Sequence, residues 1–180
     1  MKNIFVIALL LCSVAAKAQV TNVSIQASGL TCSMCSNAIN KSLRSLSFVD
    51  KVDANIKTST FEISFKPNSN INFDQIKKKV EDAGFFVADF KATIHFDKVA
   101  LANDEHVTVA GSTFHFLNVK GETLDGDKTI HIVDKGFVTA KAYKANSKFT
   151  TMECYKTGVA AACCAKDGLK EGTRIFHATI

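Results

Sequence analysis

Two cysteines, Cys32 and Cys35, carry the clearest chemistry in the sequence. A C-x-x-C loop lets two sulfurs reach one ion, and thiolates prefer soft, polarisable ions such as Cu(I), Hg(II) and Zn(II). An amphipathic helix is expected to begin at this loop, and the positive end of its dipole favours the thiolate over the thiol. We therefore predict a soft-metal site at Cys32 and Cys35.

The segments around this loop have the periodicities of short strands and amphipathic helices. Alternating apolar residues predict strands, and apolar residues at helical spacing predict two helices, the second capped by Asn72 and ended at Gly84. The expected elements are strand 23–27, helix 35–46, strand 49–56, strand 61–65, helix 73–83 and strand 85–90. The order β-α-β-β-α-β is the ferredoxin-like arrangement.

Two motifs in this region resemble the heavy-metal-associated domain family, found in copper chaperones, mercuric-ion-binding proteins and copper-pumping ATPases. Residues 29–35, G-L-T-C-S-M-C, are similar to the family's G-M-T-C-x-x-C, and residues 76–85 are similar to its second helix and following loop. The resemblance implies that Cys32 and Cys35 are the metal ligands and that Phe85 packs beneath them. Leu30 stands where the family usually has Met, and the two side chains have similar volumes. Phe85 does not indicate whether the domain donates metal to a partner or accepts it.

The resemblance implies a carrier rather than an enzyme. Such a protein would bind Cu(I) between two thiolates and pass it by ligand exchange to a copper transporter or an acceptor metalloprotein, or would sequester it. The main alternative is a thiol–disulfide redox protein, because C-x-x-C at a helix start is also a redox arrangement. A third interpretation is an interaction module whose C-terminal half binds a partner under control of the metal.

The first residues have the features of a signal peptide. Lys2 precedes a short apolar run, and small residues before Gln19 predict cleavage after residue 18, which places the product in the periplasm or outside the cell. No segment is long and apolar enough for a permanent membrane span. Cleavage lowers the formal net charge from +5 to +3, a balance that argues against a nucleic-acid partner. The basic run at residues 77–79 is expected to be a solvated helix face.

Residues 92–180 have a different pattern from residues 19–91, and we expect two domains in an α+β protein. Short apolar alternations punctuated by glycines predict about five strands, and residues 138–146 predict one helix. A small, strongly curved sheet or a partly open OB-like barrel fits this pattern. The expected strands are centred on residues 94–96, 107–109, 114–116, 130–132 and 175.

The C-terminal half contains a second group of soft ligands: Met152, Cys154, Cys163 and Cys164. Their sulfurs lie within thirteen positions and suggest a second Cu(I) site. The alternative, favoured by an oxidising compartment, is a disulfide from Cys154 to Cys163 or Cys164.

All five histidines of the chain also lie in the C-terminal half. Four of them, His95, His115, His131 and His177, alternate with apolar neighbours, so we expect them on outer faces of the sheet as scattered surface residues. A pair on adjacent strands could instead form a Cu(II) or Zn(II) site, but the sequence does not show which strands pair.

Overall fold

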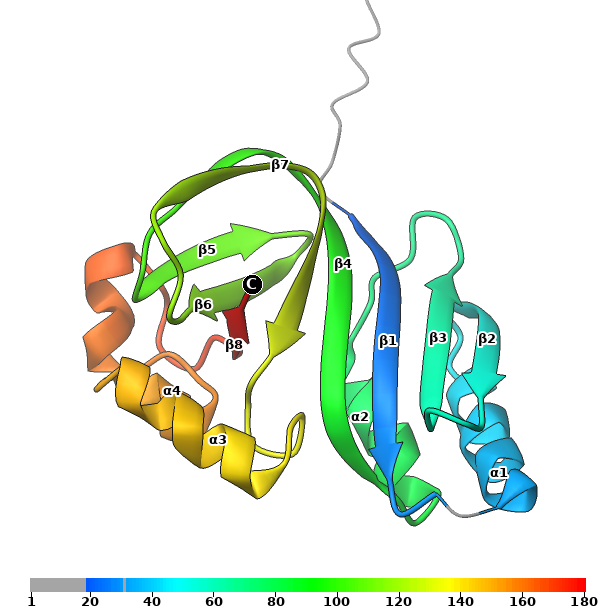
Figure 1. Cartoon of the computed structure of the whole chain (residues 1–180). Helices are drawn as coiled ribbons and strands as arrows, with labels where there is room; N and C mark the ends of the chain where they lie inside the picture. The colour runs from blue at the N-terminus through cyan, green and yellow to red at the C-terminus, as the bar shows by residue number, and fades with distance from the viewer. Residues whose placement is uncertain (1–18, 31) are drawn as a thin grey trace, which may run out of the picture.

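The computed structural model describes residues 19–30 and 32–180, so the predicted signal peptide at residues 1–18 lies outside the described part. The described strands form one eight-stranded sheet in the order β2-β3-β1-β4-β7-β8-β6-β5 (Figure 1). None of the helices described is long and apolar enough to cross a bilayer. The strands are β1 Val20–Ser28, β2 Val49–Asn55, β3 Thr60–Phe65, β4 Phe86–Leu101, β5 Glu105–Val109, β6 Ser112–Phe116, β7 Glu122–Ile132 and β8 Ile175–Thr179.

The N-terminal half has the predicted β-α-β-β-α-β order. Helices α1 (Ser33–Arg44) and α2 (Phe73–Asp82) lie side by side behind the sheet in Figure 1, where the Ser42 hydroxyl donates a hydrogen bond to the Lys79 carbonyl at 2.7 Å. The predicted cap of α2 is present, because the Asn72 side chain accepts a hydrogen bond from the Gln75 N–H at 3.0 Å. The ferredoxin-like arrangement is therefore confirmed.

Strand β4 continues well past residue 90, where the sequence pattern placed its end. Its first part pairs with β1, and from Lys91 onward its other edge pairs with β7. The expected division between residues 91 and 92 thus falls inside one 16-residue strand. Between Phe96 and Val99 the register shifts by one residue opposite Gly126, and this β-bulge accompanies the curl of β4 and β7 seen in Figure 1.

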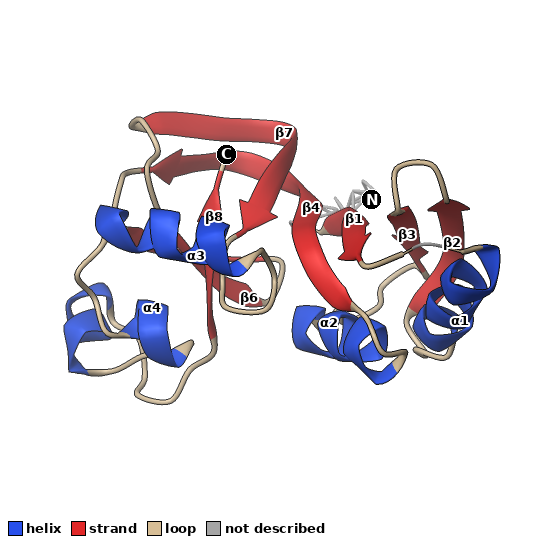
Figure 2. Cartoon of the chain, turned by 60° about the horizontal axis from the view of Figure 1, so that its bottom comes forward, coloured by secondary structure: helices blue, strands red, loops and turns tan. Residues whose placement is uncertain are grey.

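The predicted β-rich C-terminal half is confirmed, and its strands extend the same sheet. Strand β6 pairs with β5 in antiparallel fashion and with β8 in parallel fashion. The predicted helix is present as α3 (Ala140–Asn146), but the sequence analysis missed the short α4 (Cys154–Thr157) and the 3-10 helices Ser147–Phe149 and Ala162–Asp167. Figure 2 shows α3 and α4 on the C-terminal part of the sheet, apart from α1 and α2.

One apolar core joins the two halves. The Phe73 ring on α2 lies 5.6 Å from the Phe90 ring on β4, 6.2 Å from Phe114 on β6 and 5.2 Å from Phe176 on β8, between centroids. All four rings are buried. Side chains alternate across a strand, so Phe114 and Phe176 face α2 while their neighbours His115 and His177 face the opposite side, toward α4.

Candidate metal centres

The C-x-x-C motif spans the start of α1, which follows β1, and Cys35 lies in the first turn of the helix. Cys32 is the N-cap of α1, and its sulfur accepts a hydrogen bond from the Cys35 N–H at 3.2 Å. The two residues form a disulfide with their Cα atoms 5.4 Å apart. Cys32 is exposed and Cys35 is half-buried, and the first turn of α1 has no acidic residue. In the reduced state this loop would present two thiols at the positive end of a helix dipole.

Two apolar residues near the loop belong to the edge of the main core. Leu30 and Phe85 are partly buried and pack against the main core, so the substitution of Leu for Met is accommodated. Met34, between the two cysteines, is 82% exposed. The loop thus has Met34 open to solvent, while Leu30 and Phe85 belong to the edge of the main core.

The basic run on α2 is largely neutralised by its own helix. Lys77 forms an ion pair with Glu81 at 3.2 Å, and Lys78 forms one with Asp82 at 2.9 Å. Lys77 also lies over the Phe137 ring, 5.6 Å from its centroid. The expected solvated face is present at Lys78, whose side chain is 70% exposed, whereas the Lys77 side chain is only 22% exposed.

Three cysteines of the C-terminal half converge although they come from two short helical turns. The sulfurs of Cys154, Cys163 and Cys164 all lie within 4.8 Å of one another. All three are free thiols, so the alternative of a Cys154 disulfide is not what the structure shows. Met152, the fourth predicted ligand, is partly buried and packs against the apolar cluster that contains Cys154 and Cys164.

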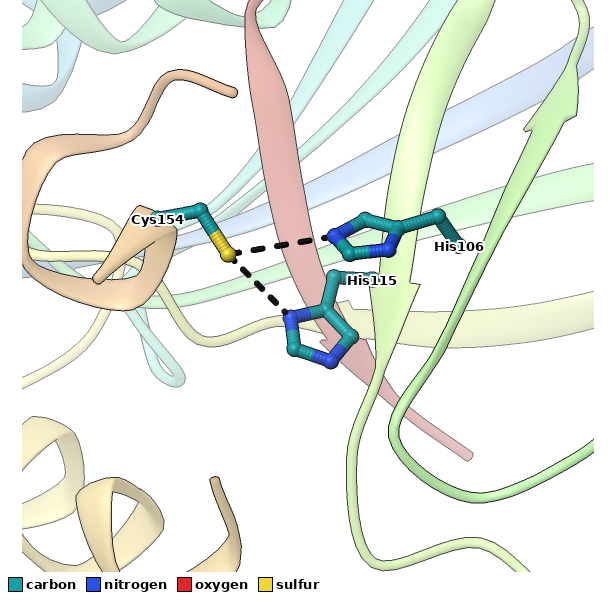
Figure 3. Close-up of side chains that lie close together, drawn as sticks. All are labelled: His106, His115 and Cys154. Atoms are coloured by element: carbon teal, nitrogen blue, oxygen red, sulfur yellow. Dashed lines mark hydrogen bonds between the residues drawn. The ribbon is translucent and has the colours of Figure 1, made fainter. Parts of the chain in front are cut away.

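Two histidines from adjacent strands, which the sequence pattern did not connect with the cysteines, form a second donor group with Cys154. The Cys154 sulfur lies 3.8 Å from Nε2 of His106 on β5 and 3.6 Å from Nδ1 of His115 on β6 (Figure 3). His106 is opposite His115 in the β5–β6 register, and His115 is opposite His177 in the β6–β8 register. The three rings therefore stand in a row on one face of the sheet, and α4 brings Cys154 over two of them.

The prediction that the histidines are surface residues is wrong for His115 and His177. Both are fully buried, and the His106 side chain is 1% exposed. The expectation holds for His95 and His131, whose side chains are 46% and 39% exposed. The error has a physical cause: an alternating strand is expected to have one wet face, but here the segment around α4 covers the second face as well. Alternation along a strand does not show that a distant segment covers its second face.

Each buried histidine has a carboxylate partner. Asp167 contacts Nδ1 of His106 at 2.5 Å, and Asp104 contacts Nε2 of His115 at 2.8 Å. These bonds leave Nε2 of His106 and Nδ1 of His115 turned toward the Cys154 sulfur.

The third buried histidine, His177, is held differently. Its Nδ1 lies 2.6 Å from Asp134, which also pairs with Arg174 at 3.2 Å, while its Nε2 is buried without a hydrogen-bond partner. His177 is not in the compact donor group formed by His106, His115 and Cys154.

Burial sets the protonation states of this group. Loss of solvent lowers the pKa of His115 to about 4, and the neighbouring His177 and His106 add to the effect, outweighing Asp104. Burial also raises the pKa of the Cys154 thiol well above its usual range. Without a cation, His115 and Cys154 are therefore neutral at pH 7, and a neutral imidazole is the form that binds metals.

Comparison with known proteins bears on the N-terminal half. Residues 24–86 match the heavy-metal-associated domain model. The chain is 35% identical over 71 residues to a probable copper-exporting P-type ATPase of Archaeoglobus fulgidus, covering 39% of this chain and 9% of that protein. It is 39% identical over 57 residues to a copper-transporting ATPase of Saccharomyces cerevisiae, covering 32% of this chain and 6% of that protein. The chain thus spans less than a tenth of the length of these relatives.

A solved structure of a yeast copper transporter domain, determined in apo and Cu(I)-loaded states, is 34% identical to this chain. The aligned region covers 37% of this chain and 90% of that domain, with a TM-score of 0.34. Residues 24–86 match the domain model, contain the C-x-x-C motif and lie within the observed β-α-β-β-α-β unit. This part of the chain is a heavy-metal-associated domain.

Proposed function

We propose that the protein captures Cu(I) between Cys32 and Cys35 and passes it to an acceptor by ligand exchange. The observation that carries this is the place of the pair: two sulfurs at the start of α1, within reach of each other and open to solvent, in a heavy-metal-associated domain. The curated relatives are copper-transporting ATPases, which favours copper over Hg(II) or Zn(II).

The exchange needs no chemistry on carbon. Two thiolates hold Cu(I), a thiolate of the acceptor attacks to give a three-coordinate ion, and one original sulfur then leaves. Cys32 is the better candidate for first contact with the acceptor because it is exposed, whereas Cys35 is half-buried. The apolar support of Leu30 and Phe85 keeps the loop in place while ligands change.

The disulfide adds a redox condition to this function. A Cys32–Cys35 disulfide has no thiolate to offer, so capture requires two electrons and two protons from a reducing partner before copper binds. The predicted signal peptide at residues 1–18 supports a periplasmic or secreted location, where such oxidation is expected. The location is tested by measuring the mass of the protein after expression in an exporting host. The expected mass is that of a mature chain that begins at Gln19.

The disulfide also favours one second candidate, a thiol–disulfide redox protein. That candidate predicts catalytic turnover of disulfides in a substrate protein, whereas the carrier predicts stoichiometric copper uptake. An insulin-reduction assay run beside a copper titration separates the two activities.

The decisive experiment is a Cu(I) titration of the reduced full chain against a competing chelator. The double variant Cys32→Ser, Cys35→Ser is expected to take up one equivalent less than the wild type, because serine hydroxyls do not replace thiolates for Cu(I). The control is Met34→Leu, which removes an exposed sulfur from the same loop and should leave the stoichiometry unchanged. Equal uptake by the wild type and the double variant would refute the proposal.

A further inference from the structure

We propose that His106, His115 and Cys154, with the sulfur of Cys163 or Cys164 as a fourth ligand, form a second metal site that holds one copper or zinc ion through mixed imidazole and thiolate ligands. The group lies in the C-terminal half and shares no residue with the Cys32–Cys35 loop. The proposal is therefore independent of the copper-transfer function.

The distances agree with a shared ion. Metal–sulfur and metal–imidazole bonds are about 2.3 Å and about 2.0 Å, so two such ligands at trigonal or tetrahedral angles lie about 3.5 to 3.7 Å apart. The Cys154 sulfur is 3.6 Å from His115 Nδ1 and 3.8 Å from His106 Nε2. All three donor atoms lie within 4.8 Å of one another, so an ion could bind with small side-chain adjustments.

The sulfur side of the group supplies the fourth ligand. The sulfurs of Cys163 and Cys164 are 3.5 Å apart, and both lie within 4.8 Å of the Cys154 sulfur. Two imidazoles with two thiolates are a tetrahedral set suited to zinc, and two imidazoles with one thiolate are a trigonal set suited to copper. Both sets exclude hard ions such as Mg²⁺ and Ca²⁺, which prefer oxygen ligands.

The carboxylates behind the rings are a second, separate argument. Metal-binding histidines ordinarily donate their other ring N–H to a carboxylate, which fixes the tautomer and the ring orientation. Asp167 does this for His106 and Asp104 does it for His115. In each case the nitrogen left over is the one that faces the Cys154 sulfur (Figure 3). Two histidines buried only for packing would not need one ring nitrogen on a carboxylate and the other directed at the same sulfur.

The place of the group in the fold indicates an ion that is retained. His115, Cys154 and Cys164 are fully buried, and Cys163 is half-buried at the outer side. Two ligands come from adjacent strands and the others from α4 and the 3-10 helix Ala162–Asp167. An ion here would fasten these short turns to the sheet, and a site with four protein ligands is closed, as structural sites are. The Cys32–Cys35 loop is open by contrast.

The test uses the full chain with Cys32→Ser and Cys35→Ser, so that the loop contributes nothing. Reduced protein is titrated with Cu(I) and, in parallel, with Zn(II). We expect one equivalent of at least one ion, a higher melting temperature with the ion bound, and an X-ray absorption spectrum with both nitrogen and sulfur neighbours. The ion that binds in the two arms identifies copper or zinc.

Three variants in this background test the site. Cys154→Ala should abolish uptake, and Asp104→Asn should weaken affinity about 10- to 100-fold by releasing the His115 ring. The matched control is His131→Gln, a half-exposed histidine that also contacts an aspartate, Asp89, and should bind as the background does. Asp104 is 36% exposed, so its variant keeps the test valid if Cys154→Ala does not fold.

Several results would overturn the proposal. Folded background protein that takes up neither ion would do so, as would uptake that Cys154→Ala and Asp104→Asn leave unchanged. A spectrum with sulfur neighbours alone would exclude the histidines as ligands. Because every protein in the series lacks the Cys32–Cys35 pair, failure here would leave the copper-transfer proposal standing.

Discussion

Replacement of Phe73 by alanine tests whether the two halves fold as one unit. The Phe73 side chain is fully buried and meets rings from β4, β6 and β8. Removal of a buried phenylalanine costs about 3 to 5 kcal/mol, since transfer energy and a residual cavity both contribute. We take about 4 kcal/mol as the expected loss, which for a chain of this size lowers the melting temperature by about 8 to 16 °C.

The assay is thermal unfolding followed by calorimetry and by circular dichroism. We expect a single transition in the wild type and in the variant, because strand β4 and the rest of the shared core still join the two halves. The matched control is Phe86→Ala, the same substitution at a side chain that is 72% exposed, with an expected change within about 0.5 kcal/mol. Two separate transitions, of which only one shifts in Phe73→Ala, would show that the shared core does not couple the halves.

Two further predictions follow from the sites. Air-oxidised protein should take up one Cu(I) less than reduced protein in parallel titrations, because the Cys32–Cys35 disulfide offers no thiolate, and equal uptake would place that copper elsewhere. Asp134→Ala should cost about 3 kcal/mol in denaturant unfolding, because it leaves the buried His177 without its 2.6 Å partner. Asp127→Ala, which removes the carboxylate beside a half-exposed histidine, should change stability by less than about 1 kcal/mol.

The shared strand changes how the C-terminal half must be studied. A fragment that begins at residue 92 lacks the first part of β4, the pairing with β1 and the Phe73 ring. Such a fragment would expose Phe114 and Phe176, which are buried in the whole chain. Experiments on the second metal site therefore need the intact protein, with the Cys32–Cys35 loop removed by substitution rather than by truncation.

The sequence determined the fold of the N-terminal half because its signals are local. The helix cap at Asn72 is a contact over three positions. Cys32 and Cys35 are also three positions apart, and both lie at the start of α1. Strand and helix periodicities repeat within a few residues, so each element could be predicted from its own segment. Their order along the chain, β-α-β-β-α-β, then indicated the ferredoxin-like arrangement.

The continuity of the sheet was decided only by the tertiary structure. Nothing local distinguishes a strand that ends at residue 90 from one that continues to Leu101, because the alternation of apolar residues is the same in both cases. The end of β4 depends on β7 pairing along its second edge, which is a contact between distant segments.

The second candidate site depended on tertiary structure in the same way. Cys154 is 48 positions from His106 and 39 from His115, and the three meet only because β5, β6 and β8 are adjacent and α4 covers them. Soft sulfur ligands could be recognised from composition, but the histidines could not, because alternation in a strand does not show whether its second face is covered. Local spacing fixes contacts within a turn or a helix, whereas contacts between strands follow from the order in which the whole sheet assembles.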